Sequence, residues 1–189
     1  MSKYSDNLFG TVLNASESKV WEQAVTEWEI VDWEEDYFCE SSCICGKEEI
    51  KYLFTIKNRI NGNELYPIGS SCIKKFERND MREITKLKEE MFRLLHAVEH
   101  DEYISLNSDY FSRKLLYALL EDGAFKANIY NDYDGENDYE FMLKMFNKRD
   151  KSAITDGQEK KIRAIIVNSI RPYLNEKIAD KVRKEQGVR

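Results

Sequence analysis

The sequence has little of what interrupts secondary structure and little of what most hydrolases use for catalysis. Among its 189 residues are two prolines, eight glycines and two histidines. There is no Gly-x-x-x-x-Gly-Lys phosphate loop, and two histidines leave little material for a Ser-His-Asp or Cys-His arrangement. No apolar run approaches the roughly 20 residues of a bilayer span, and the first residues lack the apolar core of a signal peptide. We therefore expect a soluble, intracellular protein that is not an enzyme.

The net charge of −6 is unevenly distributed along the chain. Seven acids and no lysine or arginine occur between Glu27 and Glu40, and the stretch from Leu95 to Leu143 has eleven acids against three basic residues. From Lys144 to the end, thirteen basic residues face six acidic ones. This pattern is typical either of solvated helix faces or of two oppositely charged faces that meet different partners.

The four cysteines, Cys39, Cys43, Cys45 and Cys72, are the most informative residues, because three of them fall within seven positions. In a reducing cytosol such a cluster favours a metal site over disulfides. Four thiolates suit a structural zinc ion with tetrahedral coordination and leave no open position for a substrate. The spacing is not that of the common Cys-x2-Cys pair. Free buried thiols, or a redox or disulfide role, are the alternatives.

The residues between Cys45 and Cys72 predict a β-hairpin with strands over 50–56 and 64–69. The Asn-Gly pair between these strands predicts a type I′ turn, whose backbone needs positive φ angles. The serine pair Ser70-Ser71 is expected to cap a short helix that begins beside the last cysteine. A thiolate in that position is stabilised by the helix dipole.

A knuckle, a hairpin and a helix in this order predict an α+β fold. We expect a small treble-clef or zinc-ribbon-like finger with a β-hairpin, followed by a mainly α-helical region. The finger and a preceding helix are assigned to residues 1–78, and the helical domain to residues 79–189. Apolar periodicity and capping signals predict a strand over 28–33 and helices near 16–26, 80–100, 108–121, 137–148, 155–171 and 172–185.

Three finer predictions concern the ends of these elements. Asn14 or Ser16 is the expected cap of the first helix, and Thr155 with Gln158 predicts a near capping box. Residues 125–130 fit either a short strand or a loop between helices.

A second metal motif lies in the helix predicted near residue 100. His96, Glu99 and His100 match the His-x-x-Glu-His pattern of inverted zinc metallopeptidases. The pattern is short, and no further carboxylate ligand or cleft is marked in the sequence. Both histidines lie off the apolar stripe and near the helix end, where an imidazole meets the last carbonyls favourably. We interpret them as surface histidines, with an auxiliary metal or pH-sensing role as the alternative.

Asp132 and Asp134 lie in a stretch similar to the start of a calcium-binding loop. Alignment on Gly135, however, places Tyr130 and Phe141 at the first and last ligand positions of the loop. Calcium binding requires carboxylate side chains at these two positions. The stretch is therefore interpreted as an acidic turn.

The segment that begins Cys43-Ile-Cys45-Gly and ends Gly69-Ser-Ser-Cys72-Ile resembles a small cysteine-bearing module of uncharacterised proteins from bacteriophages and other mobile elements of bacteria. The resemblance covers about 40 residues and implies that the four cysteines are zinc ligands, but it implies no defined activity. Small phage proteins without catalytic sites include inhibitors of type II CRISPR nucleases, some of which carry structural zinc. By analogy of size, acidity and origin, we expect an anti-CRISPR protein in the cytoplasm of a bacterial host cell.

Two classes of function follow from these observations. The first is a non-catalytic, zinc-stabilised module whose acidic face binds a basic surface on a bacterial protein, such as a type II CRISPR nuclease. The alternative is a nucleic-acid-binding zinc-finger protein that uses the basic C-terminal helices. Its candidate phosphate contacts are Lys148, Arg149, Lys151, Lys160, Lys161 and Arg163. The acidic character of the predicted finger favours the first class.

Overall fold

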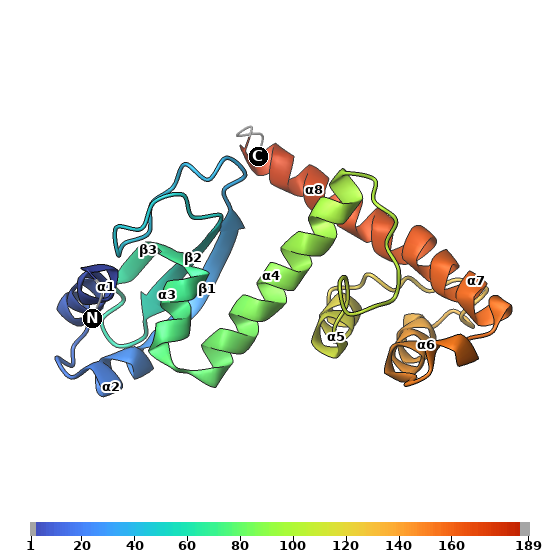
Figure 1. Ribbon diagram of the computed structural model, residues 1–189, viewed down its shortest axis with the longest axis horizontal. Coiled ribbons are helices and arrows are strands. Elements are labelled where there is room, and N and C mark those ends of the chain that lie inside the picture. The colour runs from blue at the N-terminus through green and yellow to red at the C-terminus, as the bar shows by residue number, and fades with distance from the viewer. Residues whose placement is uncertain (1–2, 186–189) are drawn as a thin grey trace. The chain divides into compact units, whose positions relative to one another are not determined.

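The computed structural model describes residues 3–185 and divides into two compact units (Figure 1). Unit 1 extends to Glu89, and unit 2 begins at Glu90. No helix among the described residues is both long enough and apolar enough to cross a membrane.

Unit 1 contains a three-stranded antiparallel sheet in the order β1-β2-β3. In chain order its elements are α1 (Lys3–Ala15), α2 (Trp21–Ala24), the 3-10 turn η1 (Val25–Glu27), β1 (Trp28–Glu35), β2 (Tyr52–Asn58), β3 (Glu64–Gly69), α3 (Ser70–Ile73), the 3-10 turn η2 (Lys74–Phe76) and the first part of α4 (Asn79–Glu99). The predicted strands and hairpin are confirmed, and with them the α+β class.

The hairpin differs from its prediction at the turn. The connection between β2 and β3 is five residues long, and Gly62 is its one residue with a positive φ, at 78°. A type I′ turn needs a positive φ at both central residues. The Asn58 side chain organises the turn instead, because its Oδ1 accepts hydrogen bonds from the N–H groups of Ile60 and Asn61 at 2.8 and 3.2 Å.

A single buried cluster holds unit 1 together. Leu8 and Val12, one turn apart on α1, pack in it with Trp28 of β1, and all three side chains are fully buried. Three of the four cysteines belong to the same cluster. The metal-binding candidates are therefore part of the core of unit 1 and not an appendage to it.

The prediction of a first helix near 16–26 is wrong. The long N-terminal helix is α1, and the segment between α1 and β1 contains only the short elements α2 and η1. Ser16 lies just beyond the end of α1, where its hydroxyl donates to the Val12 carbonyl at 2.7 Å and accepts from Trp28 Nε1 at 2.8 Å. α2 instead begins after Val20, with no side-chain cap, so neither predicted cap residue acts as one.

The carboxylate of Glu27 is buried between the α1–α2 loop and the sheet. It accepts hydrogen bonds from the N–H groups of Glu17 and Ser18 at 2.9 and 2.8 Å and from Asn58 Nδ2 at 2.6 Å. Burial by itself would raise the pKa of Glu27, but these donors outweigh it and hold the pKa below its usual 4.5.

Replacing Glu27 with glutamine should therefore destabilise the protein by about 2 kcal/mol near neutral pH, because a charged acceptor of three donors is lost. A lowered pKa stabilises the folded state above the unfolded pKa, and this contribution disappears as the pH falls through the folded value. The difference between the wild type and Glu27→Gln in urea unfolding should be smaller at an acidic pH, below the usual carboxyl pKa of 4.5, than at neutral pH. Glu29→Gln, on the exposed side of β1, is the matched control. An equal difference at both pH values would contradict this role.

Unit 2 is helical. After the end of α4 it contains α5 (Arg113–Glu121), α6 (Gly135–Asn147), the 3-10 turn η3 (Lys151–Ala153), α7 (Asp156–Ile165), the π-helix η4 (Ile166–Ile170) and α8 (Arg171–Glu185). The capping box of Thr155 and Gln158 is confirmed at the start of α7. α5 starts later than predicted, because Ser112 is its cap and accepts from the Leu115 N–H at 3.1 Å. Residues 125–130 are turns and coil, which confirms the loop interpretation.

Candidate metal centre

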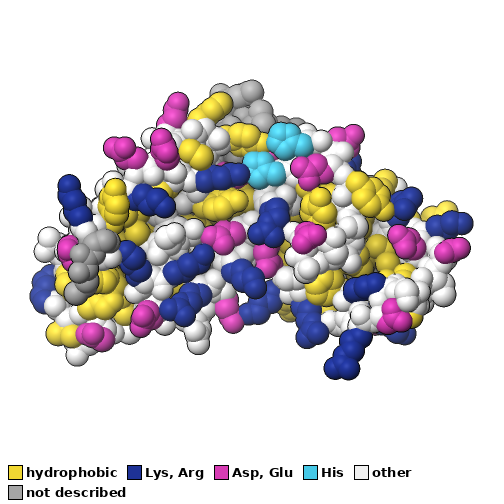
Figure 2. Space-filling view, in the orientation of Figure 1, with side chains coloured by type: hydrophobic (Ala, Val, Ile, Leu, Met, Phe, Trp, Pro, Cys, Tyr) yellow, Lys and Arg dark blue, Asp and Glu magenta, His cyan; other side chains and the backbone are white. Residues whose placement is uncertain are grey.

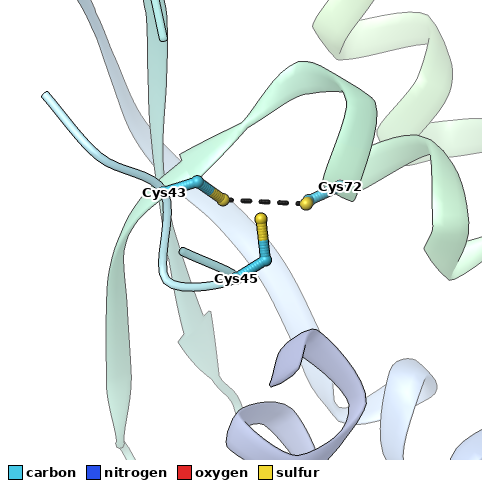
Figure 3. A group of neighbouring side chains, drawn as sticks. All are labelled: Cys43, Cys45 and Cys72. Atoms are coloured by element: carbon cyan, nitrogen blue, oxygen red, sulfur yellow. Dashed lines mark hydrogen bonds between the residues drawn. The ribbon is translucent and has the colours of Figure 1, made fainter. Parts of the chain in front are cut away.

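Three buried thiols from two segments of unit 1 converge (Figure 3). Cys43 and Cys45 lie in the loop between β1 and β2, and Cys72 is the third residue of α3. The three Sγ atoms all lie within 4.8 Å of one another, and those of Cys43 and Cys72 are 3.6 Å apart. Zn–S bonds near 2.3 Å in a tetrahedral site imply S···S separations of about 3.8 Å. The group can therefore hold a metal ion with little movement.

The loop that carries the first two thiols is a tight knuckle. The Gly46 N–H donates to the Cys43 carbonyl at 2.7 Å, and the Cys43 N–H donates to the Lys47 carbonyl at 2.8 Å. Gly46 has a φ of 87°, which glycine adopts without steric cost. From α1, Asn7 Nδ2 donates to the Cys45 carbonyl at 3.1 Å. The Cys43 end of the short Cys-x-Cys segment is therefore fixed by backbone hydrogen bonds, and the Cys45 end by the side chain of Asn7.

The electrostatic environment favours a thiolate at Cys43. Its side-chain hydrogen bond with Cys72 lowers the pKa of Cys43 to about 5, and the N–H groups of Cys45 and Gly69 add to this against the effect of burial. The same hydrogen bond, together with burial, raises the pKa of Cys72. Cys43 is thus the first of the pair to ionise, and a bound cation would take the place of the proton that the pair retains.

The helix that carries Cys72 is capped by backbone geometry. The N-cap is Gly69 and no side chain caps α3, so the prediction that Ser70 and Ser71 cap this helix is wrong. The Gly69 N–H instead donates to Cys43 Sγ at 3.3 Å. The N-cap residue of α3 therefore contacts the sulfur cluster directly.

Cys39 lies outside the group of three converging thiols. It is half-buried, has a φ of 54°, and its Sγ lies 3.8 Å from the Asp36 carbonyl. Asp36 organises this loop, since its carboxylate accepts from the N–H groups of Phe38 and Ser41 at 3.0 and 2.7 Å. Three of the four predicted ligands are thus brought together, and the fourth is held four residues away in the sequence by a separate set of hydrogen bonds.

The two histidines form no comparable centre. Their rings stack with centroids 6.2 Å apart, and His96 Nδ1 lies 3.5 Å from Glu99 Oε2. Among the side chains that the structure describes, the cysteines are the one group of three or more potential ligands that comes this close together.

The acidic turn is confirmed, because Asp134 caps α6 by accepting from the Glu136 N–H at 2.9 Å.

Two residues of the centre were not predicted, Asn7 and Gly69. Asn7 lies in α1, which was not predicted, although the spacing of Leu8 and Val12 indicates one buried helical face. Gly69 acts through its backbone, for which a side-chain pattern gives no signal.

No family model, no curated protein and no solved structure matches this chain.

Proposed function

We propose that Cys43, Cys45 and Cys72 bind a structural zinc ion and that Cys39 supplies the fourth thiolate. The convergence of three buried thiols from a knuckle and a helix supports this proposal. Their order in the chain, knuckle, hairpin and short helix, is that of a treble-clef finger. An all-thiolate site has no open coordination position, so the metal stabilises the fold and does not catalyse a reaction.

We further propose that the protein is a non-catalytic binding module for a basic protein surface. The observation that carries this is an exposed strip of acidic, aromatic and aliphatic residues on β1 and the loop after it. The strip consists of Glu29, Val31, Asp32, Trp33, Glu34, Tyr37 and Phe38. Phe38 is 82% exposed, and aromatic side chains beside charges are typical of protein interfaces.

The strip lies on an edge of the sheet, because β1 pairs only with β2 in the three-stranded sheet that the structure describes. The register shifts between Ile30 and Asp32, so Val31 forms a bulge. Such bulges protect an edge strand against indiscriminate pairing. Recognition through the side chains of the strip, and not through addition of a strand, fits this geometry.

The basic C-terminal region gives less support to nucleic-acid binding than its composition implied. Lys148 donates to the carbonyl of Ala153, which follows α6, at 2.8 Å. Lys151 donates to the carbonyl of Phe146, near the end of α6, at 2.6 Å. Lys161 Nζ lies 3.5 Å from Asp138 Oδ1. Figure 2 shows acidic and basic side chains interspersed on the face in view. Several of the candidate phosphate contacts therefore already stabilise unit 2.

The proposed target is a bacterial defence protein with a basic, nucleic-acid-binding cleft, and a type II CRISPR nuclease is the specific case to test. An acidic strip competes with phosphates for such a cleft and associates quickly at low salt. This step rests on the resemblance of the cysteine segment to modules of phages and mobile elements.

Purified protein should reduce DNA cleavage by a type II nuclease–guide complex, and the double variant Glu29→Lys/Asp32→Lys should be at least about tenfold weaker because both charges would then repel the cleft. Glu48→Lys/Glu140→Lys makes the same change in net charge at exposed positions outside the strip and should retain inhibition. Equal loss in both variants would remove the strip as the interface. No inhibition across several such nucleases would remove this target. Tight binding to DNA alone, with a steep salt dependence, would favour the nucleic-acid alternative.

A further inference from the structure

Unit 2 contains a cavity of about 530 Å³ between the loop before α6, α6 itself, and α7 with the π-helix η4. Cavities that bind small molecules typically have volumes of about 300–1,000 Å³. The helical wall presents residues four apart in two rows, which places Lys160, Ala164 and Asn168 beside Lys161, Ile165 and Ser169. Ala164 lies in the middle of this wall, and its small side chain leaves the space open.

Asp138 on the opposite wall belongs to a network of polar contacts. Asn131 and Asp138 are 2% and 3% exposed, and Asn131 Nδ2 donates to Asp138 Oδ2 at 2.9 Å. Asp138 Oδ1 lies 3.5 Å from Lys161 Nζ, which links α6 to α7. Asn131 Oδ1 accepts from the Asn128 N–H at 2.8 Å and so fixes the loop that carries Tyr130 to the rim. These contacts fix the positions of Asp138, Lys161 and the loop with Tyr130 relative to one another.

The π-helix η4 lines this cavity, and Pro172 explains why it forms. Pro172 has no N–H to donate to the Asn168 carbonyl four residues earlier, and its ring would clash with that carbonyl in a regular α-helix. The backbone widens instead, and the Arg171 N–H donates to the Ile166 carbonyl, five residues back. Short π-helical segments frequently mark functional sites. Here the widened turn carries Asn168 and Ser169, which line the cavity.

We propose that this cavity binds an aromatic organic anion of the size and chemistry of a nucleoside 5′-monophosphate. The lining has two ammonium groups and one carboxylate, and because Asp138 pairs with Lys161, the exposed ammonium of Lys160 supplies the net positive charge of the cavity. Ala164 and Ile165 form an apolar surface on which a flat ring can lie, with the Tyr130 ring at the rim. Asn168 and Ser169 place amide and hydroxyl groups at the other end for hydrogen bonds to ring heteroatoms.

Titration of the ¹⁵N-labelled full chain with AMP, GMP, CMP and UMP, followed by NMR, tests the proposal. At least one of them should shift the backbone amide signals of Asn168 and Ser169 with a dissociation constant below about 1 mM. Adenosine, which lacks the anion, and ribose 5-phosphate, which lacks the ring, should each bind at least about tenfold more weakly than the best nucleotide.

Two variants locate the ligand. Ala164→Leu fills the middle of the cavity at an exposed position and should weaken binding more than tenfold without lowering the melting temperature. Lys160→Gln should weaken binding about tenfold because a charge-assisted contact is lost. Lys144→Gln, an exposed position of α6 outside the cavity, is the matched control and should not change binding. Unchanged affinity in Ala164→Leu, equal affinity for ribose 5-phosphate, or no shift with any nucleotide up to about 5 mM would overturn the proposal.

Discussion

Replacing Cys43 with serine should weaken zinc binding by more than about 100-fold and unfold unit 1 at temperatures where the wild type is stable. Loss of groups that only support metal ligands already costs about 10–100-fold in affinity, and a ligand itself contributes more. Cys43 is also the centre of the sulfur cluster, since it contacts Cys72 and accepts from the Gly69 N–H. Because the thiols belong to the core of unit 1, metal binding by these thiols would be coupled to the folding of that core.

The measurement is the zinc content of untagged protein, together with thermal unfolding before and after a chelator. Wild-type protein should contain one zinc ion per chain, and Cys72→Ser should behave as Cys43→Ser does. Cys39→Ser separates the two possible ligand sets. If Cys39 is the fourth ligand, its serine variant loses zinc affinity as well, whereas a fourth position filled by water leaves the affinity unchanged. Well under one zinc per wild-type chain would refute the metal centre altogether.

Replacing Trp28 with alanine should destabilise unit 1 by about 3–5 kcal/mol, the usual cost of truncating a large buried aromatic residue. Trp28 is fully buried, and its indole N–H donates to Ser16 Oγ at 2.8 Å. The same substitution should weaken zinc binding, because Trp28 shares its buried cluster with the cysteines and metal binding is coupled to folding. Urea unfolding and zinc titration of the same samples measure the two effects.

Trp33→Ala is the matched control on the same strand. Trp33 is 38% exposed, and its main described contact is with the Lys88 ammonium, 3.5 Å from the centre of its ring. Such a cation–π contact contributes about 0.5–1 kcal/mol at an exposed site. Trp33→Ala should therefore leave zinc binding intact while it weakens binding to a partner of the strip. Equal destabilisation by the two substitutions would contradict the assignment of Trp28 to the core.

The sheet and the sulfur cluster could be predicted because local patterns specify them. Aromatic and β-branched residues predict β2, and the close spacing of Cys43 and Cys45 puts two thiols in one knuckle. Cys72 follows the hairpin, and the antiparallel pairing of β2 with β3 returns the chain to the knuckle. A short spacing and one hairpin were sufficient to place these three residues together.

The remaining features depend on long-range packing that no local pattern records. α1 contains glycine and several polar residues of low helix propensity, so its stability comes from the packing of Leu8 and Val12 against the sheet. The position of Cys39 depends on hydrogen bonds to Asp36, which sequence spacing does not show. The cavity in unit 2 depends on the contact of Lys161 with Asp138, 23 residues apart in the chain.

The separation of the thiols along the chain has a consequence for biosynthesis. Cys43 and Cys72 are 29 residues apart, and the whole hairpin lies between them. A nascent chain that ends before Cys72 holds only two of the converging thiols, and an ion bound to these two alone exchanges readily. Bringing Cys43 and Cys72 together costs conformational entropy, and formation of the hairpin between them already includes most of this cost. Stable binding of a metal ion by all three thiols would therefore follow the synthesis and pairing of β3, and the order of translation would protect the growing chain from trapping an ion in an incomplete site.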